Sequence, residues 1–422
     1  MKMPNSKRLT SLLNDYSEDI QKCIRCGFCN SVCPTSNASF SYKGSKTSRG
    51  RLVILQAIIS NAAEIDPFNE RFRSLIDYCF GCRRCLEVCP AGVRIPQLMW
   101  RIKHAYNVEK GSGIREKVME HYGELEKLAA RVSGFANWVK ESGLGKVILE
   151  KVGGIDRRAP FPKFSSEILE EWIRNRVRPE SNEGRLAYFI DVFTNFHEVE
   201  LGKRAVEFLE MLGYSVVAPE QKEAGTLMLE EGLLEAAEKT ARFNVDSFYR
   251  EVGKGARVLT TSPAAYVAMK KDYPELLQDE KSRKVAEKTF DILEIVKEEV
   301  ERGRIWFEGD EEEIVYHVSC FTKASGLSNL IKELLRKAGY KLRIFDECCG
   351  VAGIWGMKKE HYDEAADVGS RLFEKIRSAG LPVVSQSETC RLQIRHHTGA
   401  RVIHPFEALL ERMRVRQDAS QA

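Results

Sequence analysis

Eight of the twelve cysteines in this 422-residue chain form two short runs near its start. The members of the first run are Cys23, Cys26, Cys29 and Cys33, and those of the second are Cys79, Cys82, Cys85 and Cys89. Each run has the spacing C-x2-C-x2-C-x3-C, and a proline follows the last cysteine. Three thiolates at three-residue intervals can hold three corners of a cubane iron–sulfur cluster, while the fourth reaches the neighbouring cluster.

Because the fourth cysteine of each run reaches the other cluster, the pattern predicts two [4Fe–4S] clusters, each with ligands from both runs. The first cluster is expected on Cys23, Cys26, Cys29 and Cys89, and the second on Cys79, Cys82, Cys85 and Cys33. Structural zinc is the alternative, but zinc sites are built from two cysteine pairs rather than from a triple followed by Cys-Pro. Three arginines between the ligands either raise the cluster potentials or are solvated loop cations, and both interpretations stay open: Arg25, Arg83 and Arg84.

The other four cysteines lie far down the chain, at Cys320, Cys348, Cys349 and Cys390. Adjacent cysteines rarely form a disulfide with each other because its geometry is strained. All three places follow an expected strand, and ligand sites in α/β folds gather at the carboxyl ends of strands. The sequence therefore predicts a third metal site, with buried free cysteines as the alternative.

Two nearby residues are weaker ligand candidates. His317 lies close to Cys320, and we favour a histidine packed on a strand over a ligand. Ser387 could offer oxygen to iron, but serine is a poor partner for a soft site beside thiolates. His396, His397 and His404 are expected in loops or on the surface.

Residues 185–422, which contain the last four cysteines, look like two copies of one unit. Gly225 and Gly350 are 125 residues apart, as are Ala265 and Cys390. Each copy opens with a β-rich run, which an amphipathic helix and a second β-rich run follow. Strands that alternate with helices predict an α/β layer fold. We call residues 185–310 the first repeat and residues 311–422 the second repeat.

Residues 1–100, the ferredoxin region, and residues 101–184, the helical connection and linker, are expected to precede these repeats. A helix is expected over 50–63, and helical periodicity extends over 97–153. The aromatic and basic residues of 97–153 are compatible with an interfacial membrane helix, but we favour a platform that packs the ferredoxin region on the repeats.

Composition narrows the function classes. The net charge of +4 is small and no run rich in lysine and arginine occurs, so nucleic acid is not expected as a partner. No segment is apolar for long enough to span a membrane, and no secretory signal is recognised, so we expect a cytoplasmic chain. Attachment to the inner face of the membrane stays open.

The motifs resemble a family of iron–sulfur subunits that combine two ferredoxin motifs with two cysteine-rich CCG domains. That family includes subunits of anaerobic glycerol-3-phosphate dehydrogenase, glycolate oxidase and heterodisulfide reductase. Beside the ferredoxin runs, the resemblance lies in the segments Tyr316–Cys320, Glu347–Gly353 and Ser387–Cys390. It implies a multidomain α+β chain, in which an α-helical bis-[4Fe–4S] ferredoxin domain precedes two tandem α/β CCG-type domains.

The resemblance also implies a function. We expect an electron-transfer subunit of a hetero-oligomer, which takes electrons from a flavin-dependent dehydrogenase of glycerol 3-phosphate, glycolate or lactate. The acceptor would be a quinone, at the membrane, or another carrier. The chain has no glycine-rich nucleotide loop of its own, so the organic chemistry belongs to the partner.

The first repeat departs from the family pattern. Its cysteine positions hold Val192, Glu223, Ala224, Ser262 and Ala265, so it cannot bind a cluster. This loss argues against the alternative function, a heterodisulfide reductase-type catalytic subunit that cleaves a disulfide at a CCG-bound cluster. We expect the first repeat to contact the dehydrogenase or a second subunit, through residues 191–200.

Overall fold

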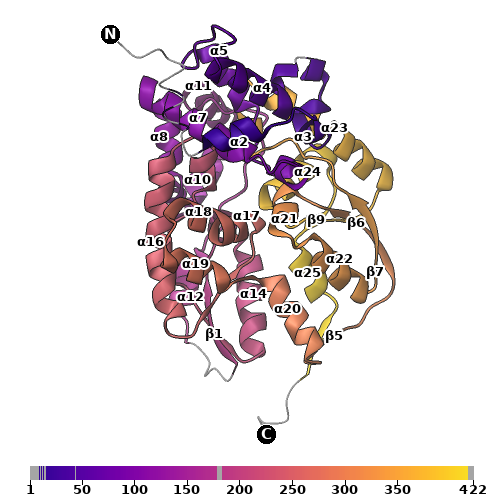
Figure 1. Ribbon diagram of the computed structural model, residues 1–422. Coiled ribbons are helices and arrows are strands. Elements are labelled where there is room, and N and C mark those ends of the chain that lie inside the picture. The colour runs from indigo at the N-terminus through magenta and orange to yellow at the C-terminus, as the bar shows by residue number, and fades with distance from the viewer. Residues whose placement is uncertain are drawn as a thin grey trace.

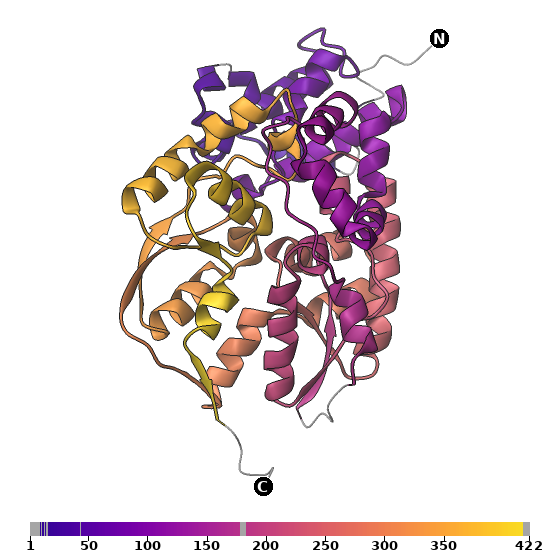
Figure 2. The same cartoon turned by 180° about the vertical axis from the view of Figure 1, so that it is seen from behind.

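The computed structural model describes residues 16–42, 44–177 and 183–416, together with Leu9, Ser11 and Leu13. Figures 1 and 2 show two α/β units side by side, with the N-terminal helices packed across one end of both. The mixture of helices and parallel sheets confirms the predicted fold class at this coarse level.

Short helices build the ferredoxin region. They are α2 (Ser17–Lys22), α3 (Phe28–Ser31), α4 (Ser48–Ile59), α5 (Glu70–Asp77) and α6 (Arg84–Glu87), with 3-10 turns at Pro34–Ser36, Ser39–Tyr42 and Gly44–Lys46. Helix α4 confirms the helix expected over 50–63. It starts where the Thr47 hydroxyl accepts a hydrogen bond from the Gly50 amide. Its buried residues Leu52, Leu55 and Ile58 pack in the core that also holds Cys85.

The predicted helical periodicity over 97–153 is confirmed. The helices are α7 (Ile95–Lys110), α8 (Ile114–Glu120), α9 (Tyr122–Arg131), α10 (Ser133–Glu141) and α11 (Gly143–Gly153), and α12 (Leu169–Asn175) follows. Helix α7 is buried at the junction and extends across residue 100.

The platform interpretation holds for only part of α8–α11, since Met119 packs with Met228 and Ala130 packs with Phe196 of the first repeat. Six apolar side chains that it placed in a packed face are 40% to 67% exposed: Val118, Leu125, Leu128, Val132, Phe135 and Trp138. The pattern of the sequence correctly gave these helices an apolar face, but no other part of the described chain covers it.

Each repeat contains a four-stranded parallel sheet. The first sheet has the order β2 (Tyr214–Val217), β1 (Gly184–Tyr188), β3 (Arg257–Thr260) and β4 (Thr289–Asp291). The second has the order β7 (Tyr340–Phe345), β6 (Glu312–His317), β8 (Val383–Val384) and β9 (Val402–Ile403). The two orders are the same, and the first two expected strands of each repeat are confirmed. Since parallel neighbours need crossover connections, helices alternate with the strands.

The crossover helices complete the layers. In the first repeat they are α13 (Val192–Phe196), α14 (Val199–Met211), α15 (Thr226–Glu230), α16 (Leu234–Val252), α17 (Pro263–Val267), a π-helical turn (Ala268–Asp272), α18 (Tyr273–Leu277), α19 (Glu280–Glu287) and α20 (Ile292–Glu301). In the second they are α21 (Cys320–Ser325), α22 (Ser328–Lys337), a 3-10 turn (Trp355–Met357), α23 (Tyr362–Ala379), α24 (Glu388–Thr398) and α25 (Pro405–Leu410). Strand β5 (Ile305–Phe307) pairs with β10 (Met413–Val415) and joins the repeats.

Reciprocal hydrogen bonds link the carboxyl ends of the two sheets. His404 Nε2 lies 3.1 Å from the carbonyl oxygen of Thr261, and the Gln386 amide donates to Asp291 across 2.8 Å. Asp291 and His404 hold matching places, because each caps the helix that follows the last strand of its sheet. The expectation of a surface position for His404 is therefore wrong, since the packing of one repeat on the other buries it.

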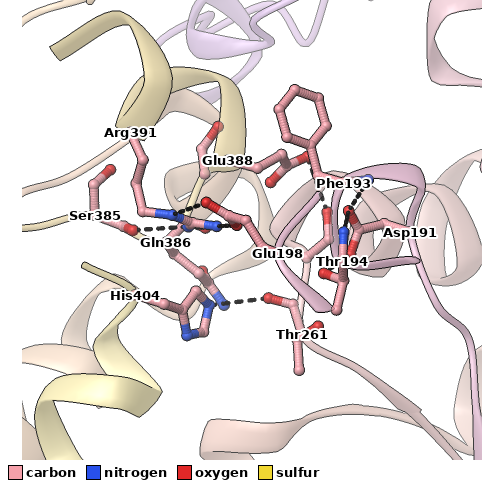
Figure 3. A network of polar contacts seen from close by, with 12 residues as sticks. Asp191, Phe193, Thr194, Glu198, Thr261, Ser385, Gln386, Glu388, Arg391 and His404 are labelled. Carbon is pink, nitrogen blue, oxygen red and sulfur yellow. Dashed lines mark hydrogen bonds and ion pairs between the residues drawn. The ribbon is translucent and has the colours of Figure 1, made fainter. Parts of the chain in front are cut away.

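A buried arginine fixes the same interface (Figure 3). Arg391 of α24 donates to the carbonyl oxygens of Ser385 and Gln386, and it forms an ion pair with Glu198 of the first repeat. His197, next to Glu198, contacts Glu126 of the helical connection at 2.9 Å. Several residues of the segment 191–200 thus have partners within the chain, while Glu200 is exposed, and contact of this segment with the dehydrogenase or a second subunit stays a prediction.

Candidate iron–sulfur sites

The second predicted ligand set lies around one cavity. Cys33 from the first run and Cys79, Cys82 and Cys85 from the second line a space of about 330 Å3 with its open mouth included. Helix α6 positions Cys85, and the turn after Cys33 starts at Pro34. The structure thus brings together the four cysteines that the cross-over pattern joins, which is a donor set suited to a cubane cluster.

Local charges favour a thiolate at Cys33. Arg51 on α4 places Nη2 3.8 Å from the Cys33 sulfur, and the Thr35 hydroxyl lies 3.1 Å away. Burial opposes ionisation, but Arg51 and Thr35 outweigh it and hold the pKa of Cys33 below its usual value. For Cys82 and Cys85, burial raises the pKa, so these sulfurs ionise readily only when iron replaces the proton.

The first site lies closer to the surface. Cys23, Cys29 and Cys89 pack on one hydrophobic core, and the Val93 amide donates to the Cys89 sulfur across 3.3 Å. Burial raises the pKa of Cys29, and the charges of Cys33, Cys23 and Cys89 add to the effect. Cys26 is exposed, on the loop before α3. This site therefore has the open edge that electron exchange with another protein requires.

The last four cysteines surround a third space, which is about 550 Å3 with its open mouth included. Cys320 starts α21 after β6, Cys348 and Cys349 follow β7, and Cys390 lies on α24 after β8. All three places are at carboxyl ends of strands, as the sequence predicted. The sulfurs of Cys349 and Cys390 are 3.0 Å apart, and none of the twelve cysteines forms a disulfide.

Backbone geometry explains the glycine after the cysteine pair. Gly350 has φ +80°, and a Cβ there would lie 2.0 Å from the carbonyl oxygen of Ala365. Its amide donates to the Cys348 sulfur across 3.3 Å. A hydrogen bond from Cys349 and this amide lower the pKa of Cys348 despite burial. The loop thus favours a thiolate at Cys348, the form that binds a metal.

The second and third sites adjoin. Cys82, a predicted ligand of the second cluster, also lines the third cavity, together with Arg84. Arg83, by contrast, is buried and pairs with Asp272 of the first repeat at 2.6 Å. The interpretation of these arginines as solvated loop cations is therefore wrong for Arg83, while Arg25 is exposed.

His317 and Ser387, the two weaker ligand candidates, lie in different surroundings. Both ring nitrogens of His317 have partners, the Ser385 hydroxyl at 2.9 Å and the Glu347 carbonyl oxygen at 3.0 Å, and burial lowers its pKa to about 4. These contacts support the packing interpretation of His317. Ser387 lines the third cavity, so its role as an oxygen ligand stays a prediction.

Within the described ranges, no three cysteine, histidine or acidic side chains are grouped as a site for a single metal ion.

Two charged residues of these cavities were missed from the sequence. Arg51 lies in the first turn of α4, directly before the apolar run that starts at Leu52, and no local pattern marks it as buried. Glu230 also lines the third cavity, although it belongs to the first repeat. No local pattern marks Glu230, because the segments it faces are more than eighty residues away in the sequence.

Comparison with known proteins supports the assignment. Residues 19–93 match the family model of the 4Fe-4S dicluster domain, and residues 314–395 match that of the cysteine-rich domain. The C subunit of the anaerobic glycerol-3-phosphate dehydrogenase of Escherichia coli K12 is 28% identical, over 94% of this chain and 99% of its own length. The probable glycolate oxidase iron-sulfur subunit of Bacillus subtilis is 23% identical, over 97% of this chain and 98% of its own.

A longer relative contains a similar segment. The D-2-hydroxyglutarate dehydrogenase of Escherichia coli K12 is 21% identical over 83% of this chain, which corresponds to 36% of that enzyme. The matches confirm the resemblance that the cysteine patterns indicated. The chain carries a 4Fe-4S dicluster domain and a cysteine-rich domain, and over nearly its whole length it is similar to iron–sulfur subunits of oxidoreductases.

Proposed function

We propose that the protein is an electron-relay subunit with three iron–sulfur clusters in a row. The observation that carries this proposal is the position of Cys82, which lines both the second and the third cysteine cavity. A bound cluster supplies one-electron chemistry, and the chain contributes thiolates, burial and nearby cations that set its potential. The third cluster is assigned to Cys320, Cys348, Cys349 and Cys390.

The first site is the proposed entry point. Cys26 is exposed there, and the apolar side chains of Ile24 and Phe28 beside it are 69% and 59% exposed. Such side chains around an exposed ligand suit a protein contact. We assign this contact to a flavin-dependent dehydrogenase subunit of a small hydroxy compound. A dehydrogenase that contains a similar segment as about a third of its length supports the pairing.

The first repeat is proposed to be a CCG-type domain that has lost its metal. It keeps the strand order of the second repeat, but Val192, Glu223, Ala224, Ser262 and Ala265 occupy its cysteine positions. Cleavage of a disulfide by two CCG-bound clusters is therefore not favoured. The organisation follows as a ferredoxin region, a helical connection, and two tandem repeats of which one binds metal.

The exposed apolar face of α8–α11 is proposed to rest on an anionic membrane surface, where a quinone acceptor is available. Phe135 and Trp138 stack with ring centres 5.9 Å apart on this face, and Ile148 and Val152 of α11 are also exposed. Aromatic and aliphatic side chains next to lysines such as Lys151 are typical of interfacial helices. No described helix has the length and apolar content needed to cross a bilayer.

Iron analysis of the anaerobically purified chain tests the relay. Three cubanes correspond to about twelve irons per chain, each cluster with an EPR signal on reduction. About eight irons with zinc in the third site would refute the three-cluster proposal.

Flotation with anionic vesicles tests the membrane surface separately. The wild-type chain should float at low salt, and Trp138→Glu should not, because a carboxylate on this face opposes insertion. A matched Trp306→Glu variant, whose side chain is also exposed but lies on β5, should float like the wild type. If the wild type stays at the bottom of the gradient, the membrane proposal is refuted.

A further inference from the structure

One wall of the third cavity comes from the repeat that has no cysteines. Glu230, the last residue of α15, lines the cavity with Cys82 and Cys320. Helix α15 starts directly after Gly225, which matches the Gly350 of the Cys-Cys-Gly loop. The segment that carries cysteines in the second repeat thus carries, in the first repeat, a carboxylate that faces the cavity of the other.

The carboxyl group of Glu230 is held between two glycine backbones. A Cβ on Gly81 would lie 3.0 Å from Glu230 Oε1, and a Cβ on Gly353 would lie 2.7 Å from Oε2. Gly81 immediately precedes Cys82 in the second ferredoxin run, and Gly353 ends the loop that starts with Cys348. Both glycines have φ +61°. The carboxyl therefore lies between the loop of the second site and the loop of the third.

Nearby cations are committed to other groups. Lys103 donates to the backbone oxygen of Glu230 at 2.7 Å and pairs with Asp77 at 3.2 Å, while Lys358 pairs with Glu231 at 2.8 Å. In the described part of the chain, the Glu230 carboxyl itself has no ion pair or hydrogen bond. Burial raises its pKa to about 8, although Lys103 opposes the shift. An acidic group that faces the cavity without a hydrogen-bond or ion-pair partner costs free energy of folding.

We propose that Glu230 tunes the passage of electrons between the second and third clusters, an inference that rests on the proposed relay. A carboxylate between two clusters disfavours an added electron on either of them, so it lowers their reduction potentials. Glu230 acts through this charge on the reduction potentials of the two clusters. This role also gives the cysteine-free repeat a reason to keep its contact with the metal-binding one.

EPR-monitored redox titration of the full, reconstituted chain tests the inference. The titrations run at pH 7 and at pH 9, because burial raises the pKa of the carboxyl and the higher pH favours its charged form. Glu230→Gln should keep its iron and its signals, and the potential of the third cluster should rise, with a smaller rise for the second. Glu230→Asp should remain close to the wild type, as should Glu235→Gln, which removes an exposed carboxylate five residues away on α16.

Each other outcome overturns the tuning role. Unchanged potentials in Glu230→Gln with full iron would show that the charge is not sensed by the clusters. Loss of iron in Glu230→Gln alone would show that the carboxylate is needed to bind the cluster. Loss of iron in both Glu230 variants would show that the side chain is needed for the packing of the cavity. A wild-type chain without a third cluster would instead refute the proposed function, so the two failures are distinguishable.

Discussion

The two repeats have the same strand order but opposite chemistry at the carboxyl ends of their sheets. In the second repeat, four cysteines enclose a cavity. At matching places in the first repeat, Ser262 donates to Glu388 of the second repeat across 3.3 Å, and Glu223 is a partly buried acid whose pKa burial raises. The sheet topology thus survives without metal, because the strands and the shared hydrophobic core stabilise it independently of the cysteines.

What the first repeat retains are the residues that face the second. Asp291, Thr261 and Glu198 contact Gln386, His404 and Arg391, respectively, across the interface. Glu230 reaches further, to the cysteine cavity itself. The comparison indicates that the first repeat is a support for the second repeat, and the following changes test that interpretation.

The largest effect is expected from Cys349→Ser. Cys349 is buried at the centre of the third set, 3.0 Å from the Cys390 sulfur. The variant should lose about four of about twelve irons and the third EPR signal, since serine oxygen is a poor replacement for thiolate. A serine at the matching position of the first repeat, Ala224→Ser, should leave the iron content unchanged. Iron analysis after anaerobic reconstitution measures both, and full iron in Cys349→Ser would refute the assigned ligand set.

Arg391→Met should be next in size. The guanidinium is buried and holds two carbonyl oxygens of the segment before α24 as well as Glu198. Without Arg391, the partly buried Glu198 keeps only the more distant Arg395 as a partner, so the free energy of unfolding should fall by about 3 kcal/mol. Chemical denaturation followed by circular dichroism measures this. Arg395→Met, which removes an exposed arginine 3.7 Å from the same carboxylate, should cost much less, and equal losses would contradict the interface role of Arg391.

Asp291 makes the interface pH-dependent. Burial raises its folded-state pKa from 3.8 to about 8, so the folded chain keeps a proton that the unfolded chain loses. The free energy of unfolding should therefore fall as pH rises from about 4 to about 8, with up to about 1.4 kcal/mol per pH unit from this group. Denaturation at pH 5.5 and 7.5 should show a shallower fall in Asp291→Asn than in the wild type. Parallel pH profiles would exclude a proton at Asp291.

Ser262→Ala should have the smallest effect. The Ser262 hydroxyl caps α17 through the Ala265 amide at 3.3 Å and donates to Glu388. Loss of this cap should cost about 1 kcal/mol of unfolding free energy and no iron. Ser387→Ala, the matching change beside the third cavity, should also keep its iron. If Ser387→Ala loses iron while Ser262→Ala does not, the serine of the second repeat is a ligand.

The sequence predicted what local spacing and periodicity determine. The two runs, the helices over 97–153 and the placement of Cys320 and Cys390 after strands all depend on short segments, and the structure agrees. Periodicity also gave α8–α11 an apolar face, but it contains no information about what covers that face. The exposure of Phe135 and Trp138 therefore could not be predicted.

Long-range packing determined the rest. His404 is buried because the loop of one repeat closes on the other, and Glu230 faces a cavity whose other walls come from residues 80–84 and from the second repeat. Arg51 is buried because α4 packs against the turn Gly44–Lys46, where its guanidinium donates to the Lys46 carbonyl oxygen and lies near the Cys33 sulfur. These placements depend on how distant segments meet, and a pattern within one segment does not encode that meeting.

The closeness of the second and third clusters is the central claim, and EPR of the fully reduced chain tests it most directly. Because Cys82 lines both cavities, the two reduced clusters should interact magnetically and give split or broadened lines. In Cys349→Ser the interaction should disappear and the second cluster should show an isolated spectrum. Magnetically isolated signals from a fully loaded wild-type chain would contradict the relay.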